Sequence, residues 1–283
     1  MSVKAFLLTV ILLLSVCLKA FAGKKSASLE ILYIANTNAL IENCHCGNPS
    51  LGGLARIATV VKEERKNNPA LILIEGGDFF NTYPFEEINR TVLSIYNQIK
   101  PDIIIPGENE FIDGLSLIKP FLEKNVNKII SSNYKIDNLN TKNYSLKSNV
   151  VFLSYLDRRV FSSVNDNKII FNDKLFKSNY EKNKKHFIVL LYHGFYEDVK
   201  KFIELYPEID IVLSAHSAAG QIGRIGNTII VGSGSDGEYV NKILLNSNGL
   251  VKTELIPVGI DIKQDKTVMK FINSFKETLK SKP

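Results

Sequence analysis

The sequence has 283 residues, with 35 basic and 29 acidic side chains and four histidines. The mild positive charge is spread along the chain and forms no basic stripe with interleaved aromatic residues, which argues against nucleic-acid binding. The length is sufficient for one large α/β domain with a full hydrophobic core.

Residues 1–22 predict a secretory signal peptide. Lys4 precedes an apolar run from residue 5 to residue 18, and Ala20-Phe21-Ala22 has the A-x-A pattern of a cleavage site. Removing Lys4 and Lys19 leaves 33 basic residues against 29 acidic ones, a net charge of +4. We therefore expect cleavage after Ala22, leaving residues 23–283 as a periplasmic or secreted protein.

Two other interpretations of this segment are a membrane anchor and a lipoprotein signal. The apolar run is short for a membrane span of about 20 residues, so we expect no membrane span. Val16 stands before Cys17, where a lipoprotein signal has a small residue, so lipidation of Cys17 is not expected.

Cleavage leaves Cys44 and Cys46, too few for a disulfide framework, so stability must come from the core.

The next part of the chain alternates apolar runs with amphipathic segments. Apolar runs predict buried strands at 29–35, 71–74, 103–105 and 129–133. Helical spacing of apolar residues predicts helices at 54–66, 86–99 and 115–124. This alternation predicts a parallel sheet with helices packed on it.

The second half of the chain is less regular. Residues 134–185 are rich in Asn and Lys, and we interpret them as hairpins and surface loops. Strands are predicted at 187–191 and 209–213, and helices at 196–206 and 266–280. Residues 228–231 and 240–245 have the pattern of antiparallel strands in a second half of the sheet.

The strand at 71–74 leads directly to Gly76-Gly77-Asp78. The glycines permit a sharp turn and leave room for a ligand. A carboxylate at the end of a buried strand lies where open α/β sheets place their ligands. An aspartate there also serves as a turn residue or a helix cap, so its role depends on partners from elsewhere in the chain.

Other predicted strands also end at polar groups. These are Asn36 and Asn38, Glu108 and Asn109, His193, and His216. Because the ends of parallel strands gather along one edge, we expect these groups near Asp78. Two carboxylates and two imidazoles there would form a divalent-metal site with balanced charge. The alternative is that each histidine lies in a separate loop or in the core.

The order of these blocks resembles the calcineurin-like metallophosphoesterases, in particular the periplasmic 5′-nucleotidase/UDP-sugar hydrolase group. That group has N-D-x-H-G, G-G-D, G-N-H-E or G-N-H-D, an isolated His, and G-H-x-H, in this order. The matching blocks here are 35–39, 76–78, 107–110, 193–194 and 215–218. The resemblance covers roughly residues 29–256 and implies a single-domain, four-layer α/β/β/α sandwich.

The resemblance implies that the first of the family's two metal sites is lost. Family enzymes hold two metals about 3.5–4 Å apart, and Asp78 matches the ligand that bridges them. The family's Asp, His and final His of the first site are replaced here by Asn36, Asn38 and Ala218. An asparagine offers a neutral oxygen and an alanine offers no ligand, so a second metal is not expected.

The resemblance leaves room for one divalent metal, such as Mn, Zn or Fe. The matching positions of the second site are Asp78, Glu108, His193 and His216. Glu108 replaces a family asparagine and remains an oxygen ligand. Asn109 takes the position of the catalytic histidine, and losing general-acid assistance typically costs about 10²–10⁴-fold in rate.

Two features add to this resemblance. Some bacterial members carry C-x-C followed by G-G-L-A-R, which here are Cys44-His45-Cys46 and residues 52–56. The three side chains could bind copper or zinc or take part in thiol chemistry, and an ordinary loop is the alternative. Arg56 could hold an anion near the cleft, pair with Asp78 or Glu110, or form a surface salt bridge.

Three functions follow as hypotheses. The first is an exported protein of this fold that binds at most one metal and is weak or inactive as a catalyst. The second is an active single-metal phosphoester hydrolase. The third is a sulfur- or copper-handling protein, since the family also includes a periplasmic thiosulfohydrolase. A small phosphorylated or sulfur-containing ligand is therefore expected. The nucleotidases' second, nucleobase-binding domain is expected to be absent, so nucleotide specificity is not carried over.

Overall fold

The computed structural model describes residues 28–43, 50–164, 168–217, 222–247, 249 and 251–281. The predicted signal peptide, the segment Cys44-His45-Cys46 and Ala218 lie outside the described residues. Among the residues that are described, no helix combines the length and the apolar character needed to cross a membrane.

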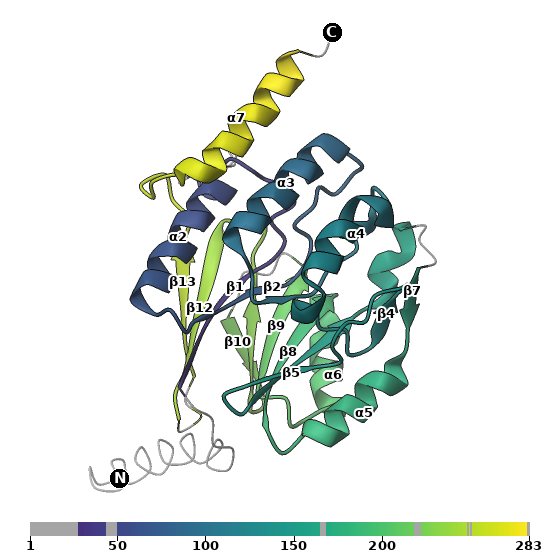
Figure 1. Cartoon of the computed structure of the whole chain (residues 1–283). Helices are drawn as coiled ribbons and strands as arrows, with labels where there is room; N and C mark the ends of the chain where they lie inside the picture. The colour runs from purple at the N-terminus through teal and green to yellow at the C-terminus, as the bar shows by residue number, and fades with distance from the viewer. Residues whose placement is uncertain are drawn as a thin grey trace, which may run out of the picture.

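Helices and strands alternate from residue 29 to residue 136 and again from 169 to 216, whereas strands follow one another between 134 and 156 and from 211 to 257 (Figure 1). The α-helices are α2 (Leu54–Asn67), α3 (Glu86–Ile99), α4 (Leu115–Lys124), α5 (Asp173–Asn183), α6 (Val199–Leu205) and α7 (Lys266–Lys280). The strands are β1 (Leu29–Ile34), β2 (Ile72–Glu75), β3 (Ile103–Ile104), β4 (Tyr134–Ile136), β5 (Ser145–Lys147), β6 (Val150–Leu156), β7 (Ile169–Phe171), β8 (Phe187–Gly194), β9 (Ile211–His216), β10 (Ile222–Ile225), β11 (Thr228–Gly232), β12 (Tyr239–Leu245) and β13 (Val251–Pro257).

Two large sheets form the centre of the described structure. The first has the strand order β13-β12-β1-β2-β3 and the second the order β10-β11-β9-β8-β6-β5. Within the first sheet β1, β2 and β3 run parallel, and within the second β6, β8, β9 and β11 do. The carboxyl ends of the parallel strands therefore gather at one edge of each sheet.

Three apolar clusters separate four layers. Leu32 and Ile34 of β1 face α2, α3, α4 and α7, whereas Ile31 and Tyr33 face the second sheet. This alternation follows from the two-residue period of a strand, and burial of both faces explains the continuous apolar run. Helices α5 and α6 cover the outer face of the second sheet (Figure 1). The predicted α/β/β/α sandwich is thus confirmed.

The prediction of two antiparallel strands near the C-terminal end is only partly right, since β11 pairs antiparallel with β10 and β12 with β13, but the two strands lie in different sheets. Residues 228–231 belong to β11, which runs parallel to β9 in the second sheet. Residues 240–245 belong to β12, which pairs antiparallel with β1 in the first sheet. Both strands contribute to the core between the sheets, through Val231 and Ile243, so their local patterns could not tell them apart.

The interpretation of residues 134–185 as hairpins and loops is only partly right. β5 and β6 form an antiparallel pair, as do β4 and β7. However, β6 is also a central parallel strand of the second sheet, and α5 was not predicted. The strand predicted at 129–133 makes only isolated bridges, such as Ile104 with Ile129.

Candidate metal centre

Asp78 lies in a tight turn directly after β2. Gly77 has φ +96° and Asp78 itself has φ +58°, so the backbone is left-handed at both positions. The Asp78 carbonyl accepts the N–H of Asn38 at 2.9 Å, which ties the turn to the end of β1. The residue is 4% exposed, and its carboxylate lies in the cluster that the ends of the two sheets form.

The structure brings Asp78 together with the three partners expected from the sequence. Glu108 follows β3, whereas His193 and His216 lie at the ends of the neighbouring parallel strands β8 and β9. Glu108 Oε2 is 2.8 Å from His193 Nε2, and its Oε1 is 2.6 Å from His216 Nδ1. Asp78 Oδ2 lies 3.5 and 3.8 Å from the same two nitrogens. One ligand atom from each residue lies within 4.8 Å of the others.

The surroundings of His193 leave its Nε2 available as a ligand. Nδ1 is 2.9 Å from the Gly76 carbonyl, and an N–H donated there leaves a lone pair on Nε2. Gly107 packs closely against the His193 ring and the Asp78 carboxylate. A Cβ at Gly107 would lie 2.4 Å from both Asp78 Oδ1 and His193 Cε1. The donor set and the close glycine packing fit a small cation.

The four groups strongly influence each other's pKa. Burial lowers the pKa of His193, but Asp78 and Glu108 outweigh burial and raise it well above its ordinary value. Burial also opposes the shift of His216, whose pKa the same carboxylates raise to about 9. Burial raises the pKa of Asp78 and Glu108, but the two histidines outweigh it and hold both pKa values below their usual range. The cluster therefore favours charged carboxylates and protonated imidazoles, and a metal would bind there by replacing the imidazole protons.

Neutral amides lie at the positions where the family resemblance predicts the first metal site. Asn36 is buried, and its Nδ2 donates to Ser233 Oγ at 2.9 Å and to the Gly234 carbonyl at 3.1 Å. Its Oδ1 accepts the backbone N–H of His216 at 2.9 Å. Asn36 is thus bonded to its surroundings through both amide hydrogens and its oxygen.

Asn38 and Asn109 lie beside each other at this position. Asn109 Nδ2 lies 3.4 Å from Asn38 Oδ1, and Asn38 Nδ2 donates to Asp236 Oδ1 at 2.9 Å. Asp236 was not predicted as a site residue, because it lies in a glycine- and serine-rich turn far along the chain. Its backbone N–H also bonds the Asn36 carbonyl, at 2.7 Å.

A second unpredicted feature lies on the His216 side of the cluster. Asp157 directly follows β6, and Arg159 pairs with both Asp157 and Asp198. The Arg159 guanidinium lies 5.0 Å from the centre of the Phe195 ring, which contacts the His216 ring at 5.1 Å. The sequence signal was available, since Asp157 is a polar group at the end of another buried strand.

Among the described residues, Arg56 does not form the ion pairs with Asp78 or Glu110 that were considered from the sequence. It is 8% exposed at the start of α2, and its Nη1 donates to Asn43 Oδ1 at 3.2 Å and lies 3.4 Å from the Gly52 carbonyl. In the described part of the chain it makes no ion pair with Asp78 or Glu110. Its contact with an anion stays a prediction.

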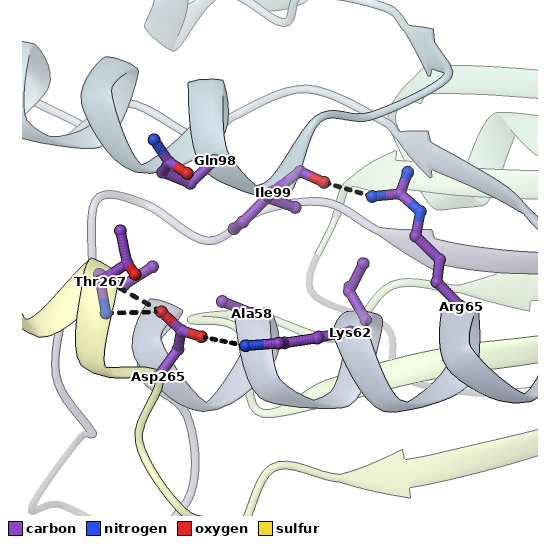
Figure 2. A pocket seen from close by; sticks show the side chains of 9 residues that line it. Ala58, Lys62, Arg65, Gln98, Ile99, Asp265 and Thr267 are labelled. Carbon is purple, nitrogen blue, oxygen red and sulfur yellow. Dashed lines mark hydrogen bonds and ion pairs between the residues drawn. The ribbon is translucent and has the colours of Figure 1, made fainter. Parts of the chain in front are cut away.

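A separate cavity of about 270 Å³ lies between α2, α3 and the start of α7 (Figure 2). Lys62 points across it to Asp265 at 3.6 Å, and Arg65 donates to the Ile99 carbonyl at 2.6 Å. Its charged side chains Lys62, Arg65 and Asp265 therefore already have bonding partners, and none of the metal-cluster residues lines it.

Comparison with known proteins agrees with this geometry. Residues 44–220 match the family model described as calcineurin-like phosphoesterase. The chain is 25% identical over 236 residues to "Protein 5NUC" of Lutzomyia longipalpis, covering 71% of this chain and 41% of that protein. It is 26% identical over 238 residues to 5′-nucleotidase of Mus musculus, covering 73% and 41%. The chain thus spans about two fifths of the length of these curated relatives.

Solved structures show the same fold. Sulfate thiohydrolase SoxB of Thermus thermophilus has a TM-score of 0.76 at 14% identity, covering 90% of this chain and 61% of that chain. A 5′-nucleotidase precursor from the same species has a TM-score of 0.75 at 16% identity, covering 90% and 59%. Since the family model matches more than half of the sequence, and the fold agrees, this chain belongs to the calcineurin-like phosphoesterase family.

Proposed function

We propose that this protein binds one divalent metal ion through Asp78, Glu108, His193 and His216, and through it a small phosphorylated ligand that it hydrolyses weakly or not at all. The convergence of one ligand atom from each of these residues within 4.8 Å carries the proposal. Two carboxylate oxygens and two imidazole nitrogens suit Mn, Zn or Fe. A metal bound there would polarise a phosphoryl oxygen as a Lewis acid.

The hydrogen bonds of Asn36 support a single metal. Its oxygen faces the His216 N–H and its amide hydrogens face Ser233 and Gly234. Recruiting that oxygen to a second cation would compete with the bond to His216. Weak catalysis is supported by Asn109, because an amide has no proton to give to a leaving group.

The ligand class is inferred from the relatives. Several are named 5′-nucleotidases, which supports a phosphate ester as the first ligand to test. A sulfur-containing ligand is the second, because one structural neighbour is a sulfate thiohydrolase. Both kinds of ligand present oxyanions to the metal, so the assay includes one of each.

Metal analysis of the purified protein tests the site. We expect one Mn, Zn or Fe per chain, lost in Asp78→Asn and His216→Ala. His186→Ala is the matched control, since His186 bonds Asn149 away from the cluster. Two metals per chain, or none from any of the three ions, would contradict the proposal.

Phosphate release from a nucleoside 5′-phosphate and an aryl phosphate, and sulfate release from a thiosulfate ester, test the activity. We expect metal-dependent binding of the phosphate esters with slow turnover. Fast turnover that His216→Ala abolishes would show an active hydrolase instead.

We also propose that the protein is exported. The support is the sequence of residues 1–22, and the expected product begins at Gly23. Mass spectrometry of the protein from an extracytoplasmic fraction should give that N-terminus, and an intact N-terminus on cytoplasmic protein would contradict export.

A further inference from the structure

We propose that Glu110 is the positioning residue of this metal centre, holding the two backbone segments that carry Asp78 and Glu108 so that their side chains converge. The inference rests on the proposed metal site and goes beyond its ligand set. Glu110 lies in a short 3-10 helix, Asn109–Phe111, two residues after Glu108.

The Glu110 carboxylate accepts four backbone hydrogen bonds from these segments. Oε2 accepts the N–H of Asp78 at 2.9 Å and of Gly107 at 2.6 Å. Oε1 accepts the N–H of Phe79 at 2.8 Å and of Phe80 at 2.9 Å. The side chain has 0% exposure, so no bulk water replaces these bonds.

These bonds act where the ligand geometry is decided. Asp78 has a left-handed backbone, which is uncommon for a residue with a side chain and persists only where the surroundings impose it. Glu110 binds its N–H and those of the next two residues, fixing the direction in which the Asp78 carboxylate leaves the turn. Through Gly107 it fixes the residue before Glu108 to the same point.

Glu110 is not itself a ligand in this arrangement. Each of its oxygens already accepts two N–H groups, and it is outside the group of converging ligand atoms. Its effect on a metal therefore passes through Asp78 and Glu108. Partners of metal ligands typically change metal affinity by about 10–100-fold when they are mutated.

Glu110→Gln tests this role, because Gln keeps the shape but places an NH2 donor against two N–H donors. We expect the dissociation constant for Mn²⁺, measured by calorimetry on the purified full chain, to rise about 10–100-fold. Glu110→Asp retains both acceptor oxygens and should recover part of the affinity. Circular dichroism at the titration temperature selects variants that remain folded.

Glu75→Gln is the matched control. Glu75 also has 0% exposure and lies at the end of β2, but it accepts only one backbone N–H in the described structure, from Gly77 at 3.1 Å. A residue that merely stabilises the fold would shift the melting temperature without changing the affinity of the folded protein. We expect Glu75→Gln to leave the Mn²⁺ dissociation constant nearly unchanged, because the glutamine oxygen can still accept the single Gly77 N–H.

The outcomes separate this inference from the function on which it rests. If the unmodified protein binds no Mn²⁺, Zn²⁺ or Fe²⁺, the proposed metal site fails. If it binds and folded Glu110→Gln binds equally well, the metal site stands and the positioning role is wrong. If Glu110→Gln does not fold, the affinity of Glu110→Asp decides, and an unchanged value overturns the inference.

Discussion

At the scale of single residues, strained backbone marks the candidate site. Asn36, Asn38, Asp78 and His216 have φ of 51°, 49°, 58° and 70°. Left-handed residues other than glycine are uncommon, and they cluster at ligand-binding sites because the surrounding contacts hold them there. Their occurrence in three segments of the cluster supports a preorganised site.

Gly107→Ala should destroy the cluster with little effect elsewhere. The new Cβ would lie 2.4 Å from Asp78 Oδ1 and 2.6 Å from His193 Nε2, so the ligands must separate. We expect loss of metal binding and a decrease of about 1–3 kcal/mol in unfolding free energy, measured by urea titration. Gly223→Ala is the control, since the atom nearest its new Cβ is 3.8 Å away. Metal binding retained in Gly107→Ala would refute this packing.

Glu75 should make stability depend on pH. Burial, mainly, raises its pKa well above the ordinary value, so the folded carboxyl stays protonated where the unfolded one ionises, above about pH 4.3. This contribution is fully present below that pH and is lost as pH rises, by at most ~1.4 kcal/mol per pH unit. Glu75→Gln lacks the titration, so its unfolding free energy relative to the unmodified protein should increase from about pH 5 to about pH 8. A difference in unfolding free energy between the two proteins that stays constant over this pH range would contradict this expectation.

The convergence of the four candidate ligands could be predicted from the sequence because each lies at or just after the end of a buried strand, and parallel strands end at one edge. The hydrogen bonds that hold the side chains of Asn36 and Asn38 could not be predicted from the sequence. Asn36 bonds Ser233 and Asn38 bonds Asp236, each across about 200 residues of sequence. No local pattern indicates which turn returns to the site.

At the scale of elements, Asp265 is the N-cap of α7. Its Oδ1 accepts the N–H of Thr267 at 2.8 Å and of Val268 at 3.1 Å (Figure 2). Asp265→Ala should lower the unfolding free energy by ~1 kcal/mol, because two N–H groups at the helix start lose their partner. Urea titration measures this, and Lys266→Ala, an exposed neighbour, should be nearly neutral. Equal effects of the two substitutions would show that the cap is unimportant.

The missed helix α5 shows the limit of periodicity. Its buried side chains include two asparagines, Asn179 and Asn183, beside Phe176 and Tyr180. Half of its inward face is therefore polar, so it lacks the continuous apolar stripe that predicted α2 and α3. Asn172, whose side chain accepts the Leu175 N–H at 3.2 Å, was the available start signal.

At the scale of the molecule, the sandwich was predicted from two observations: apolar runs in the sequence, and the order of motifs shared with the family. The apolar runs predicted buried strands, because the central strands of both sheets are buried on both faces. The allocation of strands between sheets did not follow, since β11 and β12 are adjacent in sequence and join different sheets. That choice depends on long-range packing.

The position of β12 between β1 and β13 has a consequence for how the chain acquires its shape. The first sheet pairs Leu29 with Leu245, so it is completed only after nearly the whole chain is available. Such distant pairings slow folding, because a long loop must close before any contact rewards it. Asp78 and Glu108 belong to this late sheet, whereas His193 and His216 belong to the other. We therefore expect the four side chains to come together only once both sheets have formed and packed against each other.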